Sequence, residues 1–130
     1  MYKTILVKSL VEEGETLVRT LERQRFPLVA AFWYYDPDRM TWRLFIATRT
    51  LDRHGPLHAY KRIQRALAEM GDVSLSLDDI SVVSPSGQQF NELRRQVEGI
   101  APASPVRSPK EVVFEDVYVY RWRLDGHHAP

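Results

Sequence analysis

The sequence contains no cysteine. Disulfide bonds, thiolate zinc sites and cysteine nucleophiles are therefore excluded, and the chain fits a reducing cytosol. It also has no excess of charge of one sign, since the formal net charge is +1 at pH 7. Such a balance provides no general attraction to nucleic acid or to an anionic membrane. The positive charge is mostly arginine, fourteen residues against four lysines, a bias that either serves planar contacts with carboxylates and phosphates or reflects a GC-rich genome.

Long apolar runs are missing as well. The first fifteen residues, MYKTILVKSLVEEGE, hold one short apolar run that Lys8 interrupts, so they lack the features of a secretory signal. No stretch approaches the roughly 20 apolar residues that span a bilayer. We therefore expect a cytoplasmic protein that makes no membrane contact. The 130 residues, 44% of them apolar, suffice for one domain over residues 1–130 with its own core.

Common catalytic motifs are absent. The chain has no GxxxxGK[ST], GxGxxG or GxSxG, so phosphate-cradling loops and nucleophile elbows have no support. A nuclease core of the restriction type needs an acid on one strand and Asp/Glu-x-Lys on the next. Lys110 precedes Glu111, which is the wrong order, and no lysine follows Glu115 or Asp116 at that spacing. We predict no catalytic residue, no cofactor and no metal site, and we lean against an enzyme.

The most informative stretch is residues 28–50, where two apolar runs flank Asp36-Pro37-Asp38-Arg39. Aromatic and β-branched runs around such a turn predict a β-hairpin with an even-length loop. Alternation then sorts the side chains onto two faces, and both faces are too apolar to meet water. The first face carries Val29, Ala31, Trp33, Tyr35, Trp42, Leu44 and Ile46, and the second carries Ala30, Phe32, Tyr34, Thr41, Arg43, Phe45 and Ala47.

Helical spacing predicts three helices around this hairpin. The first starts at a capping box, Ser9-x-x-Glu12, and ends before Pro27. Residues 3–7 either belong to it or form a short strand. Gly14 within it indicates a close packing contact, because glycine costs roughly 1 kcal/mol relative to alanine in a helix. The second helix runs from Gly55-Pro56 to Gly71, and the third covers residues 88–98.

The remaining elements are two strands and two irregular segments. Ile80–Val83 and residues 111–123 are the predicted strands. Residues 99–110 are expected to form an extended loop, and residues 125–130 a frayed tail. The order α-β-β-α-β-α-β predicts an α+β fold, a two-layer sandwich with a small, mostly antiparallel sheet and three helices.

If the helices cover one sheet face, the second hairpin face stays open. Arg, Tyr and Phe are enriched where partners bind, and most oligomers are symmetric homo-oligomers. We therefore expect a non-enzymatic association domain, a homodimer or a complex with a protein partner. The predicted interface residues are Phe32, Tyr34, Arg43, Phe45, Tyr118 and Arg121.

The alternative is a nucleic-acid-associated protein. Aromatic sheet faces can stack bases, but a neutral chain attracts phosphates weakly. The candidate contacts on helix faces are Arg62, Arg65, Arg94 and Arg95.

A few further residues could carry chemistry. His54 and His58 have helical metal-ligand spacing, but Gly55-Pro56 separates them, which favours a surface pair at a helix start. The acids at 36 and 38 and those at 78 and 79 are typical of turns or caps. Asp116 is expected either to pair with Arg43 or Arg121 across the sheet or to lie at a sheet edge. A small-molecule enzyme would require the histidines and Asp116 to converge.

Many of these residues also resemble an uncharacterised family of small bacterial proteins. The similarity covers about residues 10–122 and consists mainly of apolar and turn positions. It implies a fold, whereas no activity or site residue follows from it. The residues that carry it are Glu13-Gly14, Leu17, Leu21, Ala30-Ala31-Phe32-Trp33, Tyr35-Asp36-Pro37, Trp42-Arg43-Leu44, Ile46-Ala47, Gly55-Pro56, Ala59-Tyr60, Ile63 and Leu77–Pro85.

Overall fold

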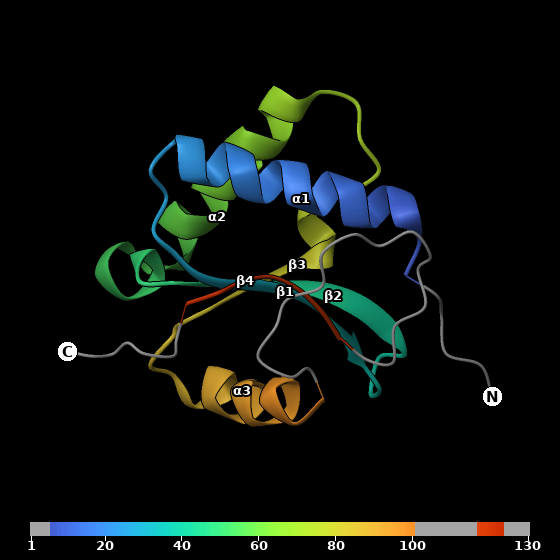
Figure 1. Ribbon diagram of the computed structural model, residues 1–130. Helices are drawn as coiled ribbons and strands as arrows, with labels where there is room; N and C mark the ends of the chain where they lie inside the picture. Colours follow the sequence, from blue (N-terminus) through green and yellow to red (C-terminus); the bar gives the residue numbers. More distant parts are fainter. Residues whose placement is uncertain (1–5, 101–116, 124–130) are drawn as a thin grey trace.

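The computed structural model describes residues 6–100 and 117–123 of the chain, and Figure 1 shows how they are arranged. The α+β class and the order of the elements are those predicted from the sequence. In chain order the elements are α1 (Lys8–Arg23), β1 (Leu28–Asp36), β2 (Thr41–Thr48), α2 (Thr50–Met70), the 3₁₀ helix η1 (Leu77–Asp79), β3 (Ile80–Val83), α3 (Gln88–Ile100) and β4 (Val117–Trp122).

The four strands form one sheet in the order β3-β2-β1-β4. β1 pairs antiparallel with β2 and β4, whereas β2 and β3 are parallel. A parallel pair requires a long crossover connection, and α2 provides it. The predicted mostly antiparallel sheet is therefore confirmed.

The β1–β2 hairpin has the even-length loop that was predicted, with Asp36 opposite Thr41. The Asp36 carboxylate accepts hydrogen bonds from the backbone N–H groups of Asp38 (3.0 Å) and Arg39 (3.4 Å). An aspartate that bonds its own turn in this way stabilises the reversal. The expected turn role of this acid is confirmed.

Alternation along the hairpin distributes the side chains between two cores as predicted, with one exception. Val29 packs with Ala30 and Phe32 instead of with Trp33. The reason is a register shift between Leu28 and Ala30, because a bulge moves the following side chains relative to the preceding ones.

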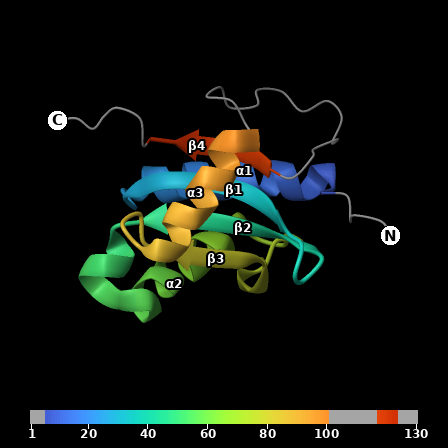
Figure 2. The same cartoon turned by 90° about the horizontal axis from the view of Figure 1, so that it is seen from below.

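Helices cover both faces of the sheet, which corrects the predicted two-layer sandwich. α1 and α2 lie side by side on one face, and α3 lies on the other (Figure 1). Figure 2 shows from below that α3 lies across the strands. The reason is topological: α3 follows β3 at one sheet edge, and the chain continues to β4 at the opposite edge. α3 makes this crossing over the face that α1 and α2 leave free.

Each face accordingly has its own apolar core. The core under α1 and α2 includes Leu17, Leu21, Trp33, Leu44, Ile46 and Ile63. The core under α3 includes Phe32, Phe45, Val83, Phe90, Val97 and Val119.

α1 does not start with the predicted capping box. Its N-cap is Val7, which makes no side-chain hydrogen bond, so Ser9 and Glu12 are already inside the helix. The first turn is closed by the backbone, since the N–H of Val11 donates to the Val7 carbonyl (3.2 Å). The capping-box prediction is therefore wrong.

Gly14 allows β4 to approach α1 closely. The Tyr120 hydroxyl donates to the Val11 carbonyl (2.5 Å) and accepts from the Trp33 indole N–H (2.9 Å). A Cβ at residue 14 would lie 2.8 Å from Cζ of Tyr120. The close contact predicted at Gly14 is confirmed. Burial raises the pKa of the Tyr120 hydroxyl far above its ordinary value, so it stays a neutral donor and acceptor.

α2 begins at Thr50, earlier than the predicted start at Gly55-Pro56. The Thr48 hydroxyl accepts a hydrogen bond from the Thr50 N–H (3.1 Å). Gly55 then interrupts the helix with φ 88° and ψ 168°, which glycine adopts readily. Pro56 follows at the start of the second helical segment, where its missing N–H is harmless, and Gly71 (φ 91°) ends the helix.

Several predictions concern residues outside the described part of the chain. α3 includes Gly99 and Ile100, so the predicted extended loop does not start at residue 99. Residues 101–110, the first part of the predicted strand 111–123 and the predicted tail 125–130 lie outside the described residues, as do residues 3–5. Leu6 and Val7 belong to neither a helix nor a strand.

Candidate functional site

The second hairpin face, on which the predicted interface depended, is covered by α3 of the same chain. Phe32 is 0% exposed and Phe45 is 5% exposed. Phe90 of α3 packs against Phe32 with ring centroids 6.4 Å apart. The prediction that these two phenylalanines form an open docking surface is therefore wrong, because it placed all three helices on the other face.

Arg43 was also predicted at the interface, and it is engaged within the fold. Its Nε donates to the Ser81 hydroxyl (2.8 Å). Its two terminal nitrogens donate to the carbonyls of Asp78 and Ile80, each at 3.1 Å. The guanidinium thus links β2 to β3 and the turn before it, which leaves it unsuited to binding a partner.

Tyr118 and Arg121 lie toward α1, away from the aromatic face to which they were assigned. Tyr118 is buried, and burial together with the charge of Glu15 raises the pKa of its hydroxyl. Arg121 donates from Nε to the Glu22 carboxylate (2.9 Å) and lies 3.7 Å from Glu15. The hydrogen bond with Glu22 raises the pKa of Arg121. Both side chains serve to hold β4 against α1.

A bulge explains this placement. The pairing of β1 with β4 shifts between Ala31 and Phe32, so the side chains beyond Tyr120 change faces. Trp122, which uninterrupted alternation would place on the face of Tyr120, packs instead against Phe32 with ring centroids 5.6 Å apart.

Glu22 is the centre of the ion cluster at this end of β4. Burial of its carboxyl raises the pKa, but hydrogen bonds from Arg121 and Arg123 outweigh that effect and leave the pKa below its ordinary value. The carboxylate therefore stays charged at neutral pH and anchors both arginines.

The four arginines proposed for nucleic-acid contact do not share a surface. Arg62 and Arg65 are on α2, whereas Arg94 and Arg95 are on α3. These helices lie on opposite faces of the sheet (Figure 1). A surface that used all four at once is therefore not formed by the fold.

Two of these arginines also have roles within the chain. Arg62 donates to the Gln24 carbonyl (3.1 Å), and its guanidinium lies 5.2 Å from the centre of the Phe26 ring. Arg94 forms an ion pair with Glu98 (3.1 Å). The contacts of Arg62 hold the connection between α1 and β1 against α2. The ion pair of Arg94 lies within α3.

The other chemistry-bearing residues remain dispersed. His54 and His58 are exposed on α2, with ring centroids 4.7 Å apart. Asp79 forms a capping box with Ser76 at η1, which confirms the predicted cap. Asp116 lies outside the described residues, so its pairing and the enzyme hypothesis stay predictions.

Within the described ranges no three His, Asp or Glu side chains are placed to hold a metal ion. No helix in these ranges has the length and the apolar character needed to cross a membrane.

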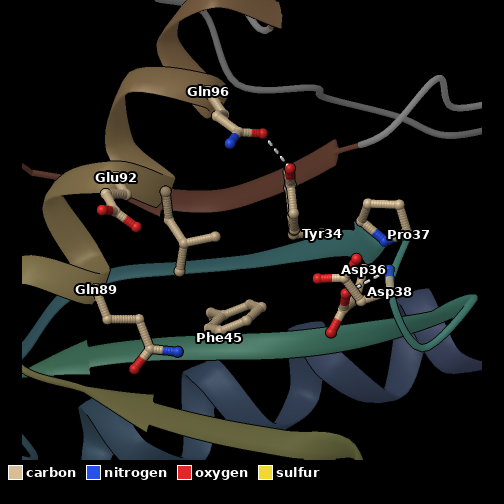
Figure 3. Close-up of a pocket in the computed structure, with 9 residues that line it drawn as sticks. Tyr34, Asp36, Pro37, Asp38, Phe45, Gln89, Glu92 and Gln96 are labelled. Atoms are coloured by element: carbon tan, nitrogen blue, oxygen red, sulfur yellow. Dashed lines mark hydrogen bonds between the residues drawn. The ribbon is translucent and has the colours of Figure 1, made fainter.

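A groove opens between α3 and the turn of the β1–β2 hairpin, with a volume of about 290 Å³ (Figure 3). Asp36 and Asp38 line it from the hairpin turn, and Glu92 lines it from α3 on the opposite side. Phe45 and Tyr34 lie between these acids at the base. The remaining lining residues are Pro37, Gln89, Leu93 and Gln96.

The base of the groove is rigid because both aromatic residues are tied to their neighbours. Tyr34 donates a hydrogen bond from its hydroxyl to the side-chain oxygen of Gln96 on α3 (Figure 3). Its ring packs edge-on against Phe45, with centroids 6.3 Å apart. These contacts fix the distance between α3 and the hairpin and so define the width of the groove.

The groove is electronegative. Three carboxylates line it, and none of the described residues that line it is Lys, Arg or His. Asp36 has one long ion pair, 3.8 Å to Arg39. Asp38 and Glu92 form no ion pair with any residue in the described ranges. A cationic group that entered the groove would therefore meet carboxylates that are free to bind it.

Carboxylates beside aromatic rings are suited to an organic cation. Carboxylate oxygens accept charge-assisted hydrogen bonds from ammonium or guanidinium groups, and aromatic rings attract cations electrostatically. Ligand pockets for drug-sized molecules measure roughly 300–1,000 Å³. At about 290 Å³ the groove lies just below that range, so it is small for a drug-sized molecule.

Some of the groove residues were singled out from the sequence, but in other roles. Tyr34 and Phe45 were predicted to bind a partner, and the acids at 36 and 38 were assigned to the turn alone. Glu92 and Gln96 were missed. Their separation by one helical turn places them on the same side of α3, but only the position of α3 over the second sheet face brings them to the hairpin.

No family model matches the chain, and neither the curated proteins nor the solved structures include a match to it. The resemblance to an uncharacterised bacterial family therefore stays a prediction. The function proposed for the groove therefore follows from its geometry alone.

Proposed function

We propose that this protein is a binding module that associates with a protein partner by taking a cationic side chain into the groove between α3 and the hairpin. This retains the association function expected from the sequence and moves the contact from the sheet face to its edge. The observation that carries the proposal is a set of three carboxylates around an aromatic base, with no basic side chain among the described residues of the lining.

Charge decides the kind of group that fits. Asp38 and Glu92 would lose water if an apolar or anionic group covered them, and burying an unpaired carboxylate is strongly unfavourable. A cation replaces the lost water with charge-assisted hydrogen bonds. The groove therefore selects for a positive group and against the others.

Among cationic side chains, arginine fits the lining best. Its guanidinium is planar, presents several donors in a fixed geometry and stacks on aromatic rings. The groove offers acids on two sides, from the hairpin and from α3, and rings beneath them. Arginine is also among the residues that contribute most to binding in protein interfaces.

The test is an NMR titration of the protein with acetyl-Gly-Arg-Arg-Gly-amide at low salt, about 50 mM, where screening is weak. We expect amide shifts at residues 34–36, at Asp38 and at residues 92–96. The isosteric citrulline peptide carries no charge and should leave these amides unchanged. Equal shifts with both peptides, or none with the arginine peptide at millimolar concentration, would contradict the proposal.

Variants locate the site. Asp38→Asn combined with Glu92→Gln should weaken the arginine peptide about tenfold, which corresponds to the loss of charge-assisted bonds worth roughly 1.4 kcal/mol. Asp72→Asn is the matched control, since Asp72 is an exposed acid far from the lining residues in sequence and in none of the ion pairs. If the control weakened binding as much as the double variant, binding would depend on overall charge and not on the groove.

A further inference from the structure

α2 concentrates positive charge on the face of the protein opposite α3. From Arg49, its N-cap, to Met70 the helix carries five Lys or Arg residues and two acids. The net charge of the whole chain is only +1, so this helix is far more basic than the average of the molecule.

Most of this charge is free. Arg49, Arg53, Lys61 and Arg65 are exposed. Among the residues described, none of the four forms an ion pair. On the other two helices Lys8, Arg19, Arg23 and Arg94 have acidic partners, and Arg95 of α3 is the basic residue without one in the described chain. Gly55 divides these residues of α2 into two pairs, Arg49 with Arg53 and Lys61 with Arg65, and the members of each pair are four residues apart. We call the two pairs together the α2 basic surface.

The spacing suits a polyanion with regularly placed charges. Lys61 and Arg65 are one helical turn apart, about 6 Å along the axis. Phosphates of one strand of B-DNA follow each other every 3.4 Å or so along the duplex. Each turn of the helix can thus meet about every second phosphate, and the exposed His58 lies on the same side, three residues before Lys61.

The composition of the surface separates a nucleic acid from a membrane or a protein as partner. Helices that lie on membranes insert an apolar face, but the apolar residues Ala59, Ile63 and Ala66 are buried against the sheet, and Leu57 is the one large exposed apolar side chain of α2. Protein interfaces depend on buried aromatic or arginine anchors in pockets, whereas the four cations of the α2 basic surface are exposed. Phosphate contacts need only accessible cations.

We infer that the α2 basic surface binds the phosphate backbone of a nucleic acid without reading its sequence. This binding is independent of the groove, which lies on the other side of the sheet. Variants that abolish binding in the groove should leave nucleic-acid binding intact, and variants of the α2 basic surface should leave binding in the groove intact.

Fluorescence anisotropy with a labelled DNA duplex of about 20 base pairs tests the inference. With both pairs of cations in contact, the logarithm of the binding constant should fall against the logarithm of the salt concentration with a slope of about −3.6, since each contact contributes roughly −0.9. Lys61→Gln combined with Arg65→Gln should halve that slope and weaken binding at least tenfold at about 50 mM salt.

Arg95→Gln is the charge-matched control for Arg65→Gln. Arg95 is exposed and without an ion pair in the described chain, but it lies on α3, so its loss should not alter the slope. Absence of binding at about 50 mM salt, an unchanged slope in the double variant, or an equal effect of Arg95→Gln overturns the inference. Binding to phosphatidylserine vesicles but not to DNA would overturn it in favour of a membrane.

Discussion

Gly14 shows how one missing side chain sets the position of a whole strand. The Tyr120 ring packs directly against the Cα atom of Gly14. The Tyr120 hydroxyl links α1 to β1 through its hydrogen bonds with Val11 and Trp33. Helix propensity alone favours alanine over glycine at an inner helical position by about 1 kcal/mol. Packing against Tyr120 acts in the opposite direction, and we expect packing to dominate.

Gly14→Ala should therefore lower the free energy of unfolding by about 1–3 kcal/mol, the usual effect of an extra group in a packed core. Urea denaturation measures this. The loss should be smaller when Gly14→Ala is introduced together with Tyr120→Phe, because the hydroxyl nearest to the new methyl group is then gone. A neutral or stabilising Gly14→Ala would show that propensity decides and that the ring moves freely.

Among the elements, α3 is the one that determines what the second sheet face can do. It buries Phe32 and Phe45 and, with the hairpin turn, creates the groove. Its apolar residues Phe90 and Val97 are fully buried. α3 is thus part of the core as much as α1 and α2 are.

Phe90→Ala should destabilise the protein by about 3–5 kcal/mol, as expected for a fully buried phenylalanine. Leu57→Ala is the control, since Leu57 is 70% exposed, and its effect should stay within about 0.5 kcal/mol. Chemical denaturation of both variants makes the comparison. Equal midpoints for the two would mean that α3 contributes little to the fold and that the face beneath it opens readily.

Local features of the fold could be predicted from the sequence, whereas long-range features could not. Hairpin pairing, β3, the end of α2 at Gly71 and the start of α3 follow from alternation, helical spacing and turn chemistry, which act over a few residues. The layer occupied by α3 does not, because it depends on the strand order β3-β2-β1-β4, which local patterns do not give. Glu92 and Gln96 became groove residues only through that choice, so the groove could not be predicted.

Bulges limit prediction in a similar way. One extra residue in β1 moved Val29, and another in β4 moved Arg121 and Trp122. Period-two counting has no means of anticipating such an insertion, since a shift by one residue exchanges the two faces.

At the scale of the whole molecule, both sheet faces are covered within one chain. The homodimer predicted from the sequence was to use the face of Phe32 and Phe45, and that face is unavailable beneath α3. Any contact between copies would have to use another surface. The effect of removing Phe45 should then be a property of the monomer.

Phe45→Ala should lower the thermal midpoint by the same amount at about 1 µM and about 100 µM protein, because unfolding that is coupled to dissociation depends on concentration and unfolding of a monomer does not. Differential scanning fluorimetry of wild type and variant at both concentrations measures this. A difference that shrinks as protein concentration rises would restore a role for Phe45 between subunits.

The position of β4 next to β1 has a consequence for synthesis on the ribosome. β1, β2, α2 and β3 are consecutive in the chain and can assemble as they emerge, whereas the partner of Ala30 in the last strand is Trp122. Until that strand has been translated, the outer N–H and C=O groups of β1 lack their ladder, and such an edge is a template for another strand. The nascent chain therefore exposes this edge of β1 in the interval between the synthesis of β3 and the synthesis of β4.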